Sequence, residues 1–517
     1  MPAASPRTEA EQIAVLMREL QRAELKILVL ETQLRLALIA KYGPKSESLN
    51  DAQLQLLDLE PGVSSAEVEA ESGREPLPEA TPVSVKKSQE NKHPGRQELP
   101  AHLPRVEKVI ACTPEQCVCK SCGNGTAVIG YERSERLDVE PARYFVLVTK
   151  REKRACKACA ASVAAAPLPE RIVEKGLVSD RVVIDTLVSK YCDHLPLYRQ
   201  SAILEREAGI SIGRATLDGW VMRVGELLIP VAAAIGKELH SSGYIQADET
   251  PVPVQTRGRT GKNHQAYLWQ YGKPGGSVVF EFRMGRDREG PKQFLGRYEG
   301  ILQTDGYAAY DRVGAPKMVH AACWAHARRK IHDALKLNPE DRMARALVAR
   351  IDELFAVDAE ARKAGMDSNA RHALRRERAV PLLETIKREM NAARAAALPA
   401  SALGKGAAYT LGLWHKLTRF VEHGELELSN NLAENSMRGV ALGRKNWIHV
   451  GSENAGPRVA AILSVMESCR RLRVPVREYL ASVLPGLCDL PRKRVAEITP
   501  EAWAERRRAD AVTLPAS

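Results

Sequence analysis

The sequence predicts an α/β protein of several domains, and three observations support this prediction. The chain has 517 residues, which is too long for one hydrophobic core, so roughly three or four folded units are expected. Five strand patterns occur in the central part of the chain, and patterns of helical period precede and follow them. Two Cys-x-x-Cys motifs lie ahead of these strands in a separate segment.

Residues 1–45 are expected to form a helix that self-associates as a coiled coil. Apolar side chains recur at alternating steps of three and four residues, which is the pattern of a heptad seam. They are Ile13, Leu16, Leu20, Ala23, Ile27, Leu30, Leu34 and Ala37. Gly43 and Pro44 end the pattern. The alternative is an amphipathic helix packed on its own domain. Residues 46–98, rich in Pro, Glu, Ser and Lys, are expected to be a flexible linker.

Residues 99–175 are predicted to form a zinc ribbon. Two Cys-x-x-Cys motifs separated by a predicted β-hairpin supply four thiolates, which is the ligand set of a tetrahedral structural Zn²⁺ site. The predicted ligands are Cys119, Cys122, Cys156 and Cys159. The hairpin is expected to include residues 143–149, and two further thiols, Cys112 and Cys117, could replace a ligand. Basic residues within 150–157 would face phosphate. The alternative is a zinc site that only stabilises a small domain.

Residues 176–236 are predicted to form a helix-turn-helix. A helical pattern leads through a turn at Gly209 into a second helix, which we expect Ser211 to cap and which includes Arg214. The second helix could enter the major groove of DNA. Helical hairpins of this appearance also serve as plain packing units, and that alternative stays open.

The central region, residues 237–475, changes to a pattern of strands. Strands are expected at 244–247, 266–271, 277–283, 301–304 and 318–321, with a helix at 291–298 and a basic helix from Trp324. Three antiparallel strands followed by a helix and a strand are the order of a ribonuclease-H-like core, in which the first and fourth strands are neighbours. A stretch rich in Ala, Arg and Glu, about 335–425, is expected to be a helical insertion. A C-terminal region follows at 476–517.

Three acidic residues in turn-like or polar surroundings are the predicted catalytic site: Asp248, Asp305 and Glu434. Phosphodiester chemistry with two divalent cations needs a few carboxylates at strand ends or on one helix face. Adjacent first and fourth strands would bring Asp248 and Asp305 together although they are 57 positions apart. Glu249 would point to the opposite face if its strand continues, so it is not expected to be a ligand.

The charge balance favours a polyanionic partner, and DNA fits the predicted chemistry. Lys plus Arg number 76 against 64 Asp plus Glu, and the pI is about 9.2. No apolar run reaches the roughly 18 residues of a membrane span, and the start lacks the layout of a signal peptide. A cytoplasmic protein without a membrane partner is therefore expected, with its ten cysteines as thiols or metal ligands rather than disulfides. No phosphate-binding GK[ST] loop, Gly-x-Ser-x-Gly or His-Glu-x-x-His motif occurs.

Several longer phrases of the sequence resemble transposases of the insertion sequence 66 family. They are Lys41-Tyr-Gly-Pro-Lys-Ser-Glu47, Leu99-Pro-Ala-His-Leu-Pro-Arg105, the paired Cys-x-x-Cys motifs, Ala247-Asp248-Glu249-Thr250, Thr304-Asp305-Gly306-Tyr307, Cys323-Trp-Ala-His326-Ala-Arg-Arg-Lys330, and Asn430-Asn431 through Arg444-Lys445-Asn446-Trp447. The resemblance covers nearly the whole chain. Members often carry Asp directly before the paired Asn, where this chain has Ser429.

The resemblance implies that Asp248, Asp305 and Glu434 are a DDE catalytic triad. Two Mg²⁺ (or Mn²⁺) ions roughly 4 Å apart would activate water to expose a 3′-hydroxyl, and then that hydroxyl to attack target DNA. It further implies a nucleoid-associated protein that recognises the terminal inverted repeats of its element. Accessory transposition proteins would assist it, and the coiled coil would make it an oligomer.

Basic residues of the helix-turn-helix and of the catalytic domain are expected to contact DNA: Arg214, Arg328, Arg329, Arg438, Arg444 and Lys445. Trp447 and His449 could stack on or bond a DNA end, or could be packing and surface residues. The resemblance makes Cys323 and His326 a Cys-x-x-His signature. A second metal site including His320 is one interpretation. Support of the strand-to-helix junction is favoured, because the pair supplies only two of the four ligands of a closed zinc site.

Two other classes of protein stay open. One is an inactive transposase remnant that acts only as a DNA-binding regulator, and the other is a nuclease with the same core that does not join strands. A helix over 459–469 is expected to pack on the catalytic sheet and to end in a basic tip of Arg470, Arg471 and Arg473.

Overall fold

The structure is a computed structural model that describes residues 143–155, 163–174, 176–256 and 263–513, with a few isolated positions before residue 143. The predicted coiled coil and linker, and the four predicted zinc ligands Cys119, Cys122, Cys156 and Cys159, lie outside the described residues. These predictions therefore stay predictions.

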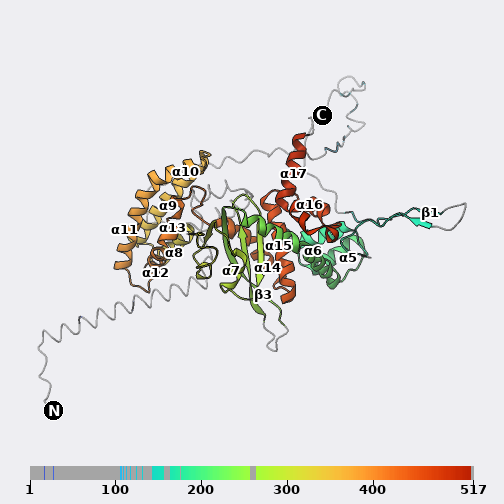
Figure 1. The fold of residues 1–517 in the computed structure, drawn as a ribbon. Helices are drawn as coiled ribbons and strands as arrows, with labels where there is room; N and C mark the ends of the chain where they lie inside the picture. The colour runs from blue at the N-terminus through green and yellow to red at the C-terminus, as the bar shows by residue number, and fades with distance from the viewer. Residues whose placement is uncertain are drawn as a thin grey trace, which may run out of the picture.

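A short antiparallel hairpin flanks the second Cys-x-x-Cys motif. It consists of β1 (Lys153–Ala155) and β2 (Val163–Ala165) and projects away from the helices behind it (Figure 1). The strand predicted at 143–149 is wrong, because this segment makes no ladder and its apolar side chains, such as Phe145 and Val146, are 71% and 87% exposed. A strand needs a partner to satisfy its backbone groups, and no described segment supplies one here.

The predicted helix-turn-helix region forms three helices: α4 (Asp180–Tyr191), α5 (Leu197–Ala208) and α6 (Arg214–His240). Gly209 ends α5 with φ of 65°, a left-handed conformation that favours glycine. The predicted Ser211 cap is wrong. Gly213 occupies the N-cap of α6, and no side chain caps it. The helix also continues past residue 236, the boundary expected for this domain.

Helix α6 is long and apolar because it is a core helix. Among the described residues it alone has the length and hydropathy of a membrane span, and 61% of the apolar window is buried inside the protein. It packs on the C-terminal helix α15 (Gly456–Arg471) and on the edge of the central sheet. Its apolar length thus reflects burial in protein.

The central sheet has five strands in the order β5-β4-β3-β6-β7. They are β3 (Tyr244–Val254), β4 (His264–Gly272), β5 (Val278–Arg283), β6 (Ile301–Thr304) and β7 (Val319–Ala322). Strands β3, β4 and β5 run antiparallel to their neighbours in this set, whereas β6 lies parallel to β3 and β7 parallel to β6. The prediction that the first and fourth strands are neighbours is confirmed. Helix α7 (Glu289–Leu295) connects β5 to β6 and ends earlier than predicted, at Gly296.

Alternation along the strands gives the sheet two different faces. Ile245 and Leu302 belong to the core formed with α6 and α15, while Tyr244 and Ile301 belong to a second core shared with the helical insertion. The prediction that the helix over 459–469 packs on the sheet is confirmed, since two serines of α15 hold the backbone of β5. The predicted basic tip is wrong at Arg471, which is 4% exposed and donates to Ser436 Oγ at 3.0 Å.

The insertion between β7 and the Glu434 helix is helical, as predicted, and lies at one side of the sheet (Figure 1). Its elements are α8 (Trp324–Leu337), α9 (Arg342–Lys363), α10 (Ser368–Leu374), η2 (Arg375–Ala379), α11 (Val380–Ala396), α12 (Ala402–Gly412), α13 (Trp414–Leu417) and η3 (Arg419–Val421). Helix α14 (Asn431–Trp447) follows, and α16 (Val476–Val483) and α17 (Pro500–Thr513) end the described chain.

A buried ion cluster holds the insertion together. Asp358 and Arg375 are each 1% exposed, and their side chains pair through two contacts of 2.7 and 2.8 Å. Arg371 reaches Asp358 at 3.2 Å and also pairs with Glu427, which precedes α14. Although burial opposes ionisation most, Arg375 and Arg371 together hold the pKa of Asp358 below its usual value.

Candidate active site

Asp248 lies inside strand β3, not in the turn-like surroundings expected from the sequence. Strand β3 pairs with β6 only from Tyr244 to Gln246, whereas its pairing with β4 continues to Val254. Asp248 therefore stands just beyond the end of β6, where one side of β3 has no neighbouring strand. The long β3–β4 ladder is why the strand continues past the acid.

Asp305 directly follows β6, as predicted, in a tight turn. Its Oδ1 accepts the N–H of Tyr307 at 2.7 Å. Gly306 has φ of 91°, and a Cβ added there would lie 2.4 Å from Leu413 Cδ1. Only glycine fits both the conformation and the space, so Gly306 fixes the direction in which the chain leaves Asp305.

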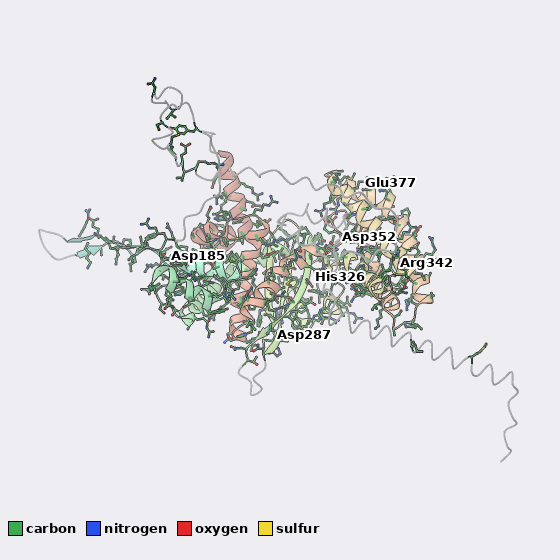
Figure 2. All side chains as sticks on the ribbon, turned by 180° about the vertical axis from the view of Figure 1, so that it is seen from behind. Asp185, Asp287, His326, Arg342, Asp352 and Glu377 are labelled. Atoms are coloured by element: carbon green, nitrogen blue, oxygen red, sulfur yellow. The ribbon has the colours of Figure 1, made fainter. Side chains whose placement is uncertain are left out.

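Glu434 lies in the first turn of α14 and faces the basic helix α8. Its Oε2 is 3.4 Å from Arg329 Nη2, and its Oε1 is 3.5 Å from His326 Nε2. His326, on α8, lies where the helical insertion meets the sheet (Figure 2). Burial alone would lower the pKa of His326, but the neighbouring Cys323 and Glu434 raise it to about 9.

Asp248 lies near enough to the other two acids for their charges to act on it. The pKa of Asp248 is raised well above its usual value, first by burial and then by the charges of Glu434, Glu249 and Asp305. Three elements that are distant in the sequence, namely β3, the turn after β6 and α14, thus carry carboxylates into one region. Mutually repelling carboxylates in a partly buried place are the arrangement that a divalent cation would relieve.

The carboxylates of the three acids are suitable ligands for a divalent cation, but their side chains are not close enough together to hold one in this structure. Hard oxygen donors of Asp and Glu suit Mg²⁺ or Mn²⁺. Buried polar atoms without a hydrogen-bond partner in the described part of the chain occur on Glu434 (Oε1), His326 (Nδ1), Gln270 and Asn430. Within the described ranges, however, no group of three or more His, Cys, Asp or Glu side chains is drawn together closely enough to hold a metal ion. Glu434 currently pairs with α8 instead.

Glu249 has partners of its own. The side chain is 1% exposed, and its carboxylate accepts from Arg286 Nε at 2.9 Å and from Tyr310 Oη at 2.8 Å. The strand does continue through it, which was the condition for its pointing away from Asp248. Arg286 also lies over the ring of Tyr307, 4.0 Å from its centroid. Sequence reasoning did not identify Arg286 or Tyr310, and no motif signalled them.

One of the predicted DNA contacts is wrong. Arg328 is 2% exposed, and its guanidinium pairs with Asp352 at 3.1 Å inside the insertion. It lies on the inner face of α8, whereas Arg329, the next residue, is 41% exposed and faces Glu434. Helical geometry places neighbouring residues about 100° apart, so two consecutive arginines can lie in different environments.

The other predicted basic residues lie at or near the surface. Arg214 is exposed in the first turn of α6, and Lys445 is exposed on α14. Arg438 is half-buried one turn after Glu434. Arg444 is tied to β3 through hydrogen bonds to the carbonyl of Pro251 and to Thr250 Oγ1.

The remaining candidates at this end of the sheet have packing contacts. Trp447 packs against the core as a partly buried side chain, and His449 is half-buried beside it. Cys323 is buried and its sulfur accepts the N–H of Asn430. The Cys-x-x-His unit therefore contacts both the start of α14 and Glu434, in keeping with a supporting role at the strand-to-helix junction.

Two buried glutamines beside the acids were also missed. Gln246 and Gln303 each precede a predicted catalytic aspartate by two positions. The repeated Gln-x-Asp spacing is a signal that could have found them. Because the side-chain period of a strand is two, Gln246 shares a face of β3 with Asp248. Gln303 is on β6, two residues before Asp305 in the turn that follows.

Comparison with known proteins gives the family of the chain. Residues 175–458, more than half of its length, match the family model described as "Transposase IS66 family", and this range contains all three acids. Residues 116–160 match the "zinc-finger binding domain of transposase IS66", and residues 29–107 match "Transposase C of IS166 homeodomain".

Relatives in one bacterium extend the similarity over almost the whole chain. The uncharacterized protein y4hP of Sinorhizobium fredii (strain NBRC 101917 / NGR234) is 31% identical, over 95% of this chain and 90% of its own length. The uncharacterized protein y4qI of the same strain is 30% identical, over 93% of this chain and 89% of its own length. With its catalytic-region match and these full-length relatives, the chain belongs to the IS66 family of transposases.

Proposed function

We propose that this chain cleaves the ends of its own insertion sequence and joins their 3′-hydroxyl ends to target DNA, with Asp248, Asp305 and Glu434 as the catalytic acids. The observation that carries the proposal is that β3, the turn after β6 and α14 bring these three acids into one region, where the charges of Glu434 and Asp305 add to the burial that raises the pKa of Asp248. The strand order, with β6 parallel to β3 and inserted helices before α14, supports a ribonuclease-H-like core.

Divalent cations, Mg²⁺ or Mn²⁺, held by these carboxylates would supply Lewis acidity and neutralise charge on the phosphate. Asp248 lies on β3 two residues beyond its pairing with β6, and Asp305 directly follows β6, so the pairing of these parallel strands brings both acids to the same end of the strand pair. Glu434 is on a separate helix and is paired with Arg329 and His326. Its movement from these partners toward the aspartates is the step that would complete the carboxylate set.

The basic side chains around the acids would position DNA. Arg329 on α8 lies beside Glu434, Lys445 is exposed near the end of α14, and Arg214 is exposed at the start of α6. Contacts of this kind bind the phosphate backbone without reading sequence, so they would hold an element end and target DNA alike. The first turn of α6, as the second helix of a helix-turn-helix, could enter the major groove.

The N-terminal part of the chain would add recognition and assembly. A Zn²⁺ ion on Cys119, Cys122, Cys156 and Cys159 fits the zinc-finger match over this segment. A coiled coil at 1–45, joined by a linker at 46–98, would make the protein an oligomer. Together with the zinc ribbon at 99–175 and the catalytic domain at 237–475, this organisation suits a protein of the cytoplasm that acts at the nucleoid, with accessory transposition proteins as further partners.

The test is a joining assay with the element's own ends. Purified protein is incubated with labelled end DNA, a target plasmid and Mg²⁺ or Mn²⁺, and cleaved and joined products are measured separately. Asp305→Asn is expected to lose both products while keeping end binding and thermal stability. Asp185→Asn is the matched control, because Asp185 is a surface acid on α4 whose side chain is 56% exposed, and it is expected to behave as wild type.

Each rival class gives a different outcome. Equal joined product from wild type and Asp305→Asn would refute the assigned site. A structure-selective nuclease would release cleaved ends that never join. A DNA-binding remnant would bind the ends and show no product with any variant.

A further inference from the structure

We infer that Gln246 and Gln303 form a buried clamp that positions Glu434 by holding the chain segment in front of its helix. The inference deepens the proposed function, since it concerns how the third acid is brought to the other two. Neither glutamine is argued to touch DNA or a cation. They are positioning residues that act through the backbone of residues 427–430, called the strap below.

The two glutamines are adjacent in the sheet and enclosed. Gln246 and Gln303 are register partners in the parallel pairing of β3 with β6, and they are 1% and 0% exposed. Gln246 Nε2 lies 3.0 Å from Gln303 Oε1, so the side chains bond to each other. Buried amides of this kind are costly unless their donors are used, which suggests a structural purpose for them.

Their remaining donors are directed at the strap. Gln303 Nε2 donates to the carbonyl of Glu427 at 2.7 Å, and Gln246 Nε2 donates to the carbonyl of Ser429 at 3.0 Å. The hydroxyl of Tyr244, on the same face of β3, accepts the N–H of Glu427 at 3.3 Å and bonds to both glutamines. The sheet thus holds alternate residues of the strap, in the manner of a further strand paired through side chains.

Helix α8 holds the intervening residues of the strap. The N–H of Trp324 donates to the carbonyl of Leu428 at 2.8 Å, and the sulfur of Cys323 accepts the N–H of Asn430 at 3.5 Å. Each of the four strap residues is therefore bonded through its backbone to β3, β6 or the start of α8. Asn430 is also the N-cap of α14, so fixing it fixes where the helix begins.

The position of Glu434 follows from this anchoring. It lies one turn after Asn430, and the N-cap of α14 has no side-chain hydrogen bond of its own. The helix start is therefore set by the strap and not by local capping. Gln246 shares a face of β3 with Asp248, and Gln303 lies two residues before Asp305 at the end of β6. The two strands that lead to the aspartates therefore also hold, through the strap, the start of the helix that carries Glu434.

The strap also connects the catalytic helix to the insertion. The carboxylate of Glu427 pairs with Arg371 at 3.2 Å and with Arg362, while its backbone is held by the glutamines. The clamp thus forms the sheet side of a joint whose other side is the buried ion cluster. Loosening either side would free the start of α14.

The test removes the donors of one glutamine without changing its size. Gln303→Met in the full-length protein leaves the Glu427 carbonyl without this partner, and Gln246→Met is the second variant if the first folds poorly. Hydrogen exchange of peptides covering residues 428–437 and the affinity for Mn²⁺, measured by electron paramagnetic resonance, are the two readouts. Both are expected to change about tenfold, as loss of a buried hydrogen bond implies: faster exchange and weaker binding.

Ser468→Ala is the matched control. Its hydroxyl makes two buried bonds of 2.9 Å with the backbone of Val278 on β5, on the other side of the sheet from the strap. It should loosen β5 and lower thermal stability while leaving exchange at 428–437 and Mn²⁺ affinity as in wild type. If the glutamines had only a general structural role, all three variants would show the same change in hydrogen exchange at 428–437 and in Mn²⁺ affinity.

A cycle with Glu434→Gln completes the design. If Gln303 acts through Glu434, Gln303→Met should not weaken Mn²⁺ binding further in the Glu434→Gln background. Unchanged exchange at 428–437 in both glutamine variants would overturn the clamp, even if the wild type joins DNA. Faster exchange with no DNA joining by the wild type would instead leave the clamp standing and refute the proposed function.

Discussion

Arg375→Met tests whether the buried ion cluster holds the helical insertion together. Arg375 is 1% exposed and binds Asp358 through two parallel contacts, while its Nη1 donates to the carbonyls of Phe420 and His423 at 3.0 Å each. Methionine keeps most of the volume of the side chain but removes every donor. Asp358 would lose its closest partner in a place that water does not reach.

The expected loss of stability is about 3 kcal/mol. Breaking a buried ion pair by removing one partner costs about 3–5 kcal/mol, because the remaining charge stays buried. The lower end applies because Arg371 still lies 3.2 Å from Asp358. A loss of this size corresponds to more than 100-fold in an equilibrium constant, since about 1.4 kcal/mol is tenfold.

Hydrogen exchange of the amides of α9 measures this loss without requiring the whole chain to unfold in one step. Exchange in Arg375→Met should be about 100-fold faster than in wild type. Arg378→Met is the matched control, because Arg378 pairs with Glu360 where both side chains are exposed (44% and 56%). An exposed pair contributes about 0.2–1 kcal/mol. If the two variants exchange alike, the buried cluster does not stabilise the insertion as argued.

The pH dependence of the same amides gives an independent check. Despite the opposing effect of burial, Arg375 and Arg371 hold the pKa of Asp358 below its usual value. Its contribution to stability is therefore present above the pKa of the unfolded carboxyl, about 4, and is lost as the pH falls through the lower folded value. Protection of α9 in wild type should decline with acid over that window, and the decline should be smaller in Arg375→Met.

Three further outcomes are expected. Gly306→Ala should abolish DNA joining and lower the melting temperature, since alanine at φ of 91° is strained and its Cβ has no room; normal joining would contradict the role given to this turn. Arg328→Met should destabilise the fold by about 2 kcal/mol or more with little change in DNA affinity. Lys445→Met should lower the DNA affinity and its salt dependence without a change in melting temperature. The opposite pattern would mean that Arg328 contacts DNA and Lys445 stabilises the fold. Cys119→Ser and Cys156→Ser should each lose bound zinc by elemental analysis, and full zinc content in both would exclude these ligands.

Much of the catalytic region could be predicted from local sequence patterns. The five strands follow from periodicity over a few residues, the neighbouring positions of the first and fourth from the order of the elements, and the helical insertion from its composition. The segment 143–149 shows the limit of such patterns. It has strand composition, but a strand also needs a partner, and composition does not report one.

Burial of individual charged side chains could not be predicted in the same way. Arg328 and Arg329 are identical neighbours, yet one is enclosed with Asp352 and the other faces Glu434. Likewise Arg471, expected at a basic tip, bonds Ser436 in the interior. The orientation of a helix about its axis depends on what packs against it, and that information lies elsewhere in the chain.

The sequence by itself determined the family of the protein. Three acids in distinctive phrases, paired Cys-x-x-Cys motifs and an excess of basic residues identify a DNA transposase family. Residue types and short spacings can be recognised in the sequence without knowledge of the fold. Only the tertiary structure decided the positions of the three acids relative to one another. The parallel pairing of β3 with β6 brings the two aspartates to one end of the strand pair, and two buried glutamines hold the strap that precedes the helix of Glu434. Hydrogen bonds between residues up to 183 positions apart leave no local pattern in the chain.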